Sequence, residues 1–78
     1  MTFEQFISEW EFKFQHGPKH FRKGQSLMNY LADVWPSEYE KMVSIHYYDR
    51  TDIDCYYNDD LIPNTLQHLQ DKWYKFPK

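Results

Sequence analysis

The sequence predicts an all-α fold: a small bundle of three main helices and one short helix, with a tyrosine- and aspartate-rich loop before the last helix. Three observations lead to this expectation. Apolar residues recur at intervals of three and four in several segments. Capping pairs stand where two of these segments begin, and glycine or proline stands where segments end. With 78 residues the chain has the length of one domain, which we expect to span residues 1–78.

The first helix is expected at residues 3–15. Thr2 and Gln5 fit a capping box, in which the threonine side chain accepts from a free N–H and the glutamine reaches back. Gly17-Pro18 should end the helix, with the glycine able to take a left-handed conformation. The apolar spacing marks one buried face, formed by Phe3, Phe6, Ile7, Trp10 and Phe14.

The second helix should begin near Gly24 or Gln25 and end before Pro36, because the residue before a proline is pushed out of the helical region. Ser37 and Glu40 then form another capping box, which should open a short helix. The apolar positions on one face of the second helix are Leu27, Met28, Leu31 and Val34 or Trp35.

Residues 46–60 break the helical pattern. They contain two Tyr-Tyr pairs and five aspartates without a sustained period, and aspartate favours turns because it hydrogen-bonds to nearby backbone. Asp59 or Asp60 should cap the last helix, whose first turn tolerates Pro63. The stripe of that helix is Ile62, Leu66, Leu69, Trp73 and Phe76. The length and the tyrosines of the loop predict an ordered, functional segment.

Aromatic residues dominate the composition. The chain has 3 Trp, 7 Tyr and 6 Phe, or 21% of its residues. A core of this size cannot hide so much aromatic surface, so some tyrosine and tryptophan should be exposed, where these residue types favour recognition. The net charge of -3 lacks the basic excess of most nucleic-acid-binding domains. These features predict a binding protein.

The composition also predicts a location. The single Cys55 cannot form an internal disulfide, which is typical of a reducing cytosol. The sequence has no run of about 18 apolar residues, so we expect no transmembrane helix. The sequence begins without a basic region followed by an apolar stretch, so we expect no secretory signal. We therefore expect a cytoplasmic protein.

The acidic, tyrosine-rich segment is the main candidate binding surface. Tyrosine provides a large, rigid contact area with a polar tip, and aspartates can meet basic groups on a partner. The plainer alternative is a solvated surface. The expected partner-binding residues are Tyr47, Tyr48, Asp49, Asp52, Asp54, Tyr56, Tyr57 and Asp59.

The loop at residues 19–23 is an alternative site, for nucleic acid. Lys19, Arg22 and Lys23 would meet phosphates, and Phe21 would stack on a base. The loop carries only three formal charges and has acidic segments on both sides. A solvated loop, with Phe21 packed before the second helix, is therefore the plainer interpretation.

Metal and catalytic chemistry find little support. The aspartates of residues 49–60 match no register of a calcium loop. The histidines lack zinc spacing and are expected at the surface: His16, His20, His46 and His68. Cys55 with His46 and Asp52 could be drawn as a nucleophile, a base and an orienting group, but cysteine is more often buried. We expect no enzyme activity, no metal and no cofactor.

Two stretches carry a resemblance. Gly24-Gln25-Ser26-Leu27-Met28-Asn29-Tyr30-Leu31 leads to Pro36-Ser37-Glu38-Tyr39-Glu40, and Tyr57-Asn58-Asp59-Asp60-Leu61-Ile62-Pro63 leads into a helix that reaches Trp73. Over residues 21–73 this pattern resembles a group of small uncharacterised proteins of bacteriophages and prophages. The resemblance implies a viral accessory protein in the bacterial host cytoplasm, and no activity. By analogy, we expect a non-enzymatic protein that binds and modulates a host protein.

Phe12 lies off the apolar face of the first helix. It should therefore either pack under a loop or face a partner, and Tyr30 and Trp35 raise the same question. An exposed aromatic set would indicate self-association, commonly as a two-fold homodimer. A self-assembling structural protein is thus a further alternative.

Overall fold

The computed structural model describes residues 1–44 and 50–77, which form helices and no strands. Within these ranges lie α1 (Phe3–His16), α2 (Lys23–Val34), α3 (Pro36–Val43) and α4 (Ile62–Lys72). Short 3-10 helices accompany them: η2 (Thr51–Ile53), η3 (Asp59–Leu61) and η4 (Trp73–Lys75). The all-α prediction is confirmed. The short helix is α3, with 8 residues against 11 to 14 in the others.

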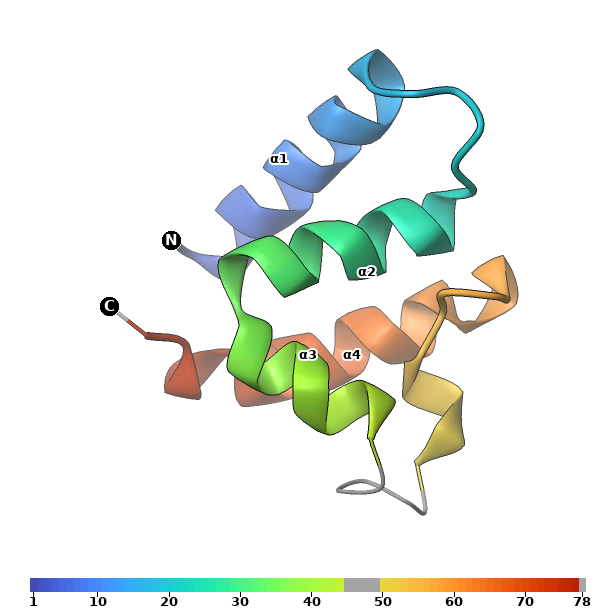
Figure 1. Cartoon of the computed structure of the whole chain (residues 1–78). Coiled ribbons are helices and arrows are strands. Elements are labelled where there is room, and N and C mark those ends of the chain that lie inside the picture. Colours follow the sequence, from blue (N-terminus) through green and yellow to red (C-terminus); the bar gives the residue numbers. More distant parts are fainter. Residues whose placement is uncertain (45–49, 78) are drawn as a thin grey trace.

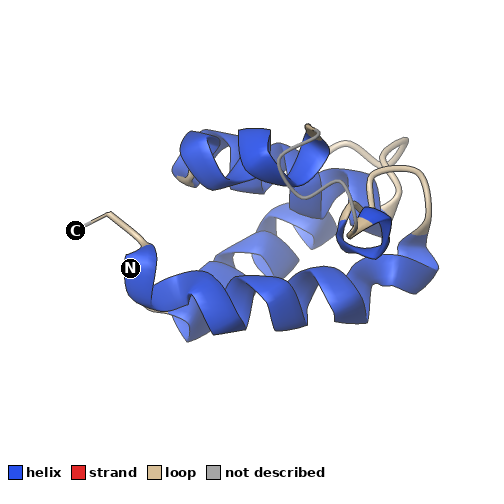
Figure 2. Cartoon of the chain, turned by 90° about the horizontal axis from the view of Figure 1, so that it is seen from below, coloured by secondary structure: helices blue, strands red, loops and turns tan. Residues whose placement is uncertain are grey.

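The helices pack around α2. In Figure 1, α1 lies along one side of α2, α4 runs back along the other side, and α3 turns away from the end of α2. The two ends of the chain lie on the same side of the molecule in Figures 1 and 2. The Trp73 indole Nε1 donates to the Met1 carbonyl oxygen at 3.1 Å, which ties α1 to η4.

The start of α1 is the predicted capping box. The Thr2 hydroxyl accepts from the Gln5 N–H at 3.1 Å, and the Thr2 N–H donates to the Gln5 side chain at 2.8 Å. The helix continues one residue past the expected end, to His16. Gly17 does not adopt the left-handed conformation that we expected, since its φ is -95°. Its backbone instead approaches the Lys13 carbonyl oxygen too closely to leave room for a Cβ.

The junction between α2 and α3 differs from the predicted capping box at Ser37 and Glu40. Pro36 is the first residue of α3, and the cap position belongs to Trp35 without a side-chain hydrogen bond. Proline suits this position because its missing N–H would have no helical partner there. The Trp35 N–H donates to the Leu31 carbonyl at 2.8 Å, which ends α2, and its own carbonyl accepts from Tyr39 at 3.0 Å. One residue therefore serves both helices.

The start of α4 also differs from the prediction that Asp59 or Asp60 caps it. Residues 59–61 form η3, whose cap is Asn58, with the Asn58 side chain accepting from the Asp60 N–H at 3.0 Å. The helix α4 begins only at Ile62, with Pro63 in its first turn as expected. The Asp59 carboxylate instead contacts the beginning of α2.

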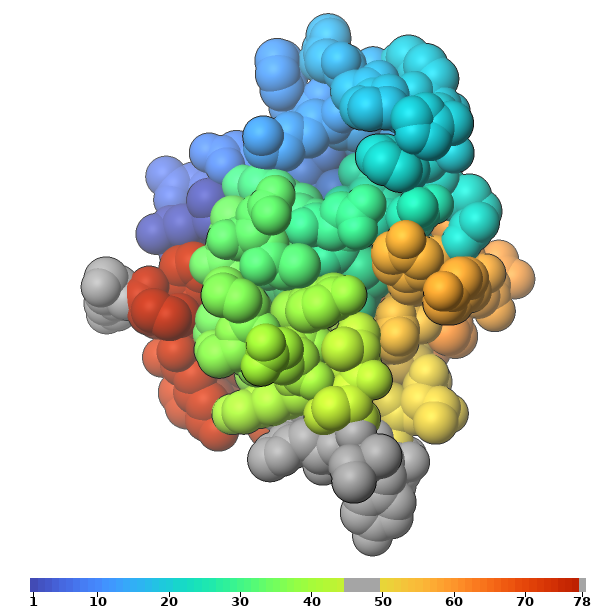
Figure 3. Space-filling model, viewed as in Figure 1, coloured from blue at the N-terminus to red at the C-terminus, as the bar shows by residue number. Residues whose placement is uncertain are grey.

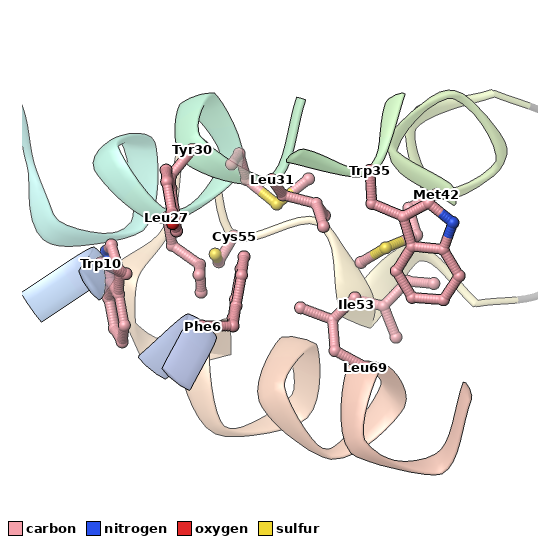
Figure 4. Packing of buried hydrophobic residues seen from close by; sticks show 11 residues of the cluster. Phe6, Trp10, Leu27, Tyr30, Leu31, Trp35, Met42, Ile53, Cys55 and Leu69 are labelled. Carbon is pink, nitrogen blue, oxygen red and sulfur yellow. The ribbon is translucent and has the colours of Figure 1, made fainter. Parts of the chain in front are cut away.

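The core draws side chains from every α-helix, from η2 and from the segment after η2 (Figure 4). The sequence left open whether Tyr30 and Trp35 pack within the chain or face a partner; both are buried in the core. Trp73 and Phe76 extend it as an aromatic cluster, with Trp73 5.1 Å from Phe6 and 5.4 Å from Trp35 between ring centroids. The buried hydrophobic residues are Phe6, Trp10, Leu27, Met28, Tyr30, Leu31, Trp35, Met42, Ile53, Cys55 and Leu69.

Candidate protein-binding surface

The described part of the acidic segment, residues 50–60, is anchored by two inward side chains. Ile53 and Cys55 are fully buried, and they alternate with Asp52 and Asp54 on the outside. The Thr65 hydroxyl donates to the Ile53 carbonyl at 2.7 Å, which fixes the segment to α4. The expected ordered loop is therefore present over these residues.

The beginning of α2 anchors the other half of the segment. The Asp59 carboxylate accepts from the Gly24 N–H at 2.9 Å, so it caps α2 from 35 positions away in the sequence. Arg22 donates to the Tyr56 carbonyl, and its Nε lies 4.0 Å from the Asp59 carboxylate. A Cβ on Gly24 would overlap the Cys55 carbonyl oxygen. Glycine is needed here because two backbones meet.

Two more of the predicted binding aspartates have local partners. Asp52 accepts from the Arg50 guanidinium at 3.0 Å, and this hydrogen bond lowers the pKa of Asp52. The Asp54 carboxylate accepts from the Tyr56 N–H at 3.1 Å and so fixes the turn. Asp60 differs from both: it is exposed, and its carboxylate makes no hydrogen bond or ion pair with any residue of the described ranges.

The two described tyrosines have different environments. Tyr56 is half-buried, and its hydroxyl accepts from the Gln25 amide at 3.1 Å. Tyr57 packs edge-on against the Tyr56 ring, with 4.7 Å between centroids, and leaves 83% of its surface exposed. The other predicted members, Tyr47, Tyr48 and Asp49, lie outside the described residues. The described members of the expected set, Asp52, Asp54, Tyr56, Tyr57 and Asp59, thus lie on the segment that packs on α2 and α4.

The basic loop directs its cations toward its own chain. Lys19 donates to the Gln15 carbonyl at the end of α1, and Arg22 holds the acidic segment. The Lys23 ammonium lies 5.4 Å from the centre of the Trp10 ring. Phe21 is half-buried beside His20, with 4.4 Å between the rings. Lys19, Arg22 and Lys23 thus each have a contact within the chain, and all three residues remain exposed.

Sequence reasoning missed a buried pair between α3 and α4. The His68 Nε2 lies 2.8 Å from the Glu38 carboxylate, and the two residues are only 5% and 2% exposed. The prediction that all histidines lie at the surface is therefore wrong for His68. The spacing of Thr65, His68 and Leu69 on α4 carries the signal, because these residues share one helical face.

The described residues bear on the Cys55 set and on metal ligands only in part. Cys55 is fully buried, its thiol lies 3.5 Å from the Gly24 carbonyl, and burial raises the pKa of the thiol. His46, the base in the hypothetical set of Cys55, His46 and Asp52, lies outside the described residues. No group of three or more metal-ligating side chains occurs in residues 1–44 and 50–77. None of the helices described there is both long and apolar enough to cross a bilayer.

Comparisons with known proteins identify no relative. No protein family, curated protein or solved structure was found that matches this chain. The function must therefore be argued from the surface itself.

Proposed function

We propose that this chain is a small, non-enzymatic, phage-type protein that binds and modulates a bacterial host protein in the host cytoplasm. The contact is made by the Tyr57 surface, by which we mean the outward side chains of residues 50–60 around Tyr57. The observation that carries the proposal is the position of Tyr57: its ring is 83% exposed on a segment that the fold holds on both sides.

A fixed, exposed tyrosine is suited to recognition. Its ring offers a large amphipathic area, and the hydrogen bonds at Thr65, Asp54 and Asp59 have already ordered the backbone that presents it. Binding therefore loses little conformational freedom at this segment. Tyrosine is also among the residue types that dominate binding energy in protein interfaces.

The charge of the surface indicates the kind of partner. Four aspartates and one arginine lie between residues 50 and 60. The carboxylates of Asp52 and Asp59 are nearly half exposed despite their internal partners, and Asp60 is exposed as well. A partner with lysine or arginine around an apolar recess complements this pattern.

Capture from bacterial lysate tests the proposal. Tagged protein, with and without nuclease, is compared with Tyr57→Ala and with the matched control Tyr74→Ala, which removes a ring that is 76% exposed on η4. We expect one host protein to be retained after nuclease treatment, bound by the control and lost with Tyr57→Ala. A hot-spot tyrosine contributes about 2 kcal/mol, or roughly a thirtyfold change in Kd.

Charge variants complete the test. Asp60→Lys should weaken capture without unfolding the protein, and the complex should weaken with added salt. Equal capture by Tyr57→Ala and Tyr74→Ala would contradict the proposal. Loss of every partner after nuclease treatment would instead favour nucleic acid and the loop of Lys19, Phe21, Arg22 and Lys23.

A further inference from the structure

The outward side of α1 carries an exposed aromatic ring next to a hollow. Phe12 is 63% exposed, and its ring lies 4.3 Å from that of its helical neighbour His16. Phe12 borders a hollow of about 420 Å³ between α1 and α2. Pro18, Phe21 and Tyr30 also line this hollow. It is distinct from the Tyr57 surface, with which it shares no residue.

The ring and the hollow are complementary to each other. Part of the lining is apolar, from Pro18, Phe21 and the Tyr30 ring, beside polar residues such as Ser26 and Asn29, and the volume of the hollow exceeds that of a phenyl side chain. Because the ring stands at the edge of its own hollow, a two-fold rotation places the ring of each copy against the hollow of the other. This is the condition for an isologous contact, in which both subunits use the same patch.

The charges of α1 favour the same arrangement. Glu4, Glu9 and Glu11 precede Phe12 in the helix, whereas Lys13 and His16 follow it in the last turn. Of these three acids, Glu9 shares a side of α1 with Phe12 and Lys13, so two antiparallel copies place Glu9 of each copy opposite Lys13 and His16 of the other. Antiparallel helices also bring opposite ends of their dipoles together.

The mixed charge argues against other occupants. Lys13 and Asp33 both line the hollow, and Glu9 borders the adjoining one together with Ser8. A polyanion such as nucleic acid would meet Asp33 and Glu9, and a cationic segment would meet Lys13. A second copy presents both signs in the matching order.

We propose that two copies of this chain associate through α1 across a two-fold axis near Phe12, with each Phe12 ring seated in the α1–α2 hollow of the other copy. Figure 3 shows α1, in blue, at the border of the molecule, so a second copy can approach it from outside. The dimer would present two Tyr57 surfaces, and a host protein with two binding sites would then gain avidity.

Solution mass tests the proposal on purified protein. Light scattering across a concentration series should show a monomer passing to a dimer. Phe12→Ser should raise the dimer Kd at least tenfold, whereas the control Tyr74→Ser should leave it unchanged. Both rings are exposed, so both variants should keep the far-UV circular dichroism of the parent protein. Lys13→Glu should also raise the Kd, by up to about tenfold, because it sets like charges against each other.

Three results would overturn the proposal. One is a monomer at every concentration reached, and another is a dimer that Phe12→Ser does not weaken. The third is an equal loss of the dimer in the Phe12 and Tyr74 variants. Binding of a host protein by the Tyr57 surface of each copy is tested separately, through Tyr57→Ala.

Discussion

Replacing Gly24 with alanine sets two effects against each other. Alanine in place of a helical glycine usually stabilises a helix by up to about 1 kcal/mol. Here the added Cβ would overlap the Cys55 carbonyl oxygen and stand 2.8 Å from the Asp59 carboxylate. The first obstacle is backbone of a segment that Ile53 and Thr65 hold in place, so it cannot move aside alone.

The magnitudes decide the sign. Overpacking a tight site costs about 1–3 kcal/mol, and losing the hydrogen bond from the Gly24 N–H to the Asp59 carboxylate costs about 1.5–3 kcal/mol. Subtracting the helical gain leaves a loss of roughly 1.5–5 kcal/mol. At 0.05–0.15 kcal/mol per residue, a chain of 78 residues has a total stability of only about 4–12 kcal/mol. We therefore expect Gly24→Ala to lower Tm by about 6 °C or more, at about 4–8 °C per kcal/mol.

Urea and thermal unfolding followed by circular dichroism measure this loss. Asn29→Ala, at an exposed position of α2, is the matched control and should change stability by less than about 0.5 kcal/mol. The overpacking part of the cost should persist in an Asp59→Ala background, because the Cys55 backbone remains in the way. If Gly24→Ala equals or exceeds the parent protein in stability, the acidic segment does not pack on α2 as described, and the rigid platform under Tyr57 is refuted with it.

Three further predictions concern buried and paired groups. Glu38→Ala, which removes the His68 contact, should destabilise the protein by about 3 kcal/mol in urea unfolding, and Glu38→Gln, which keeps a hydrogen-bonding oxygen, should cost clearly less; equal losses would contradict a role for this contact. A carbon-detected NMR titration should give Asp52 a pKa below its ordinary 3.8, returning toward it in Arg50→Ala. Because the folded pKa is lowered, the contribution of this pair to stability is present above the unfolded pKa and is lost as the pH falls through the folded value. The Cys55 thiol should react with a thiol reagent only as fast as the protein unfolds, since it is buried and its pKa is raised; rapid reaction of the native protein would show that the site opens locally.

The first helix could be predicted closely because its signals are local. The Thr2 capping box, the stripe through Phe6 and Trp10 and the stop at Gly17-Pro18 all lie within the helix or next to it. The beginning of α2, expected near Gly24 or Gln25 and found at Lys23, has no local capping pattern. Its cap is Asp59, which reaches Gly24 only once the chain has folded back. A pattern of neighbouring residues carries no information about such a partner.

Other wrong predictions concern residue types that are compatible with two structural roles. Proline both ends a helix and opens one, and at Pro36 it does both. In the acidic segment, Ile53 and Cys55 alternate with Asp52 and Asp54. This alternation is short, and the surrounding tyrosines and aspartates make it hard to recognise in the sequence. Reading that alternation would have shown that the segment is anchored from inside.

The internal roles of the aspartates also change how the binding surface should be probed. Reversing the charge of Asp54 or Asp59 removes a turn or the cap of α2 together with any contact to a partner, so a loss of binding would have two explanations. Asp60 and Tyr57 carry no such structural duty beyond the edge contact with Tyr56. The sequence does not distinguish aspartates that hold the segment in place from aspartates that face outward. The structure does. A binding defect that appears in Asp60→Lys and Tyr57→Ala, with unfolding unchanged in both, is the pattern that a recognition surface requires.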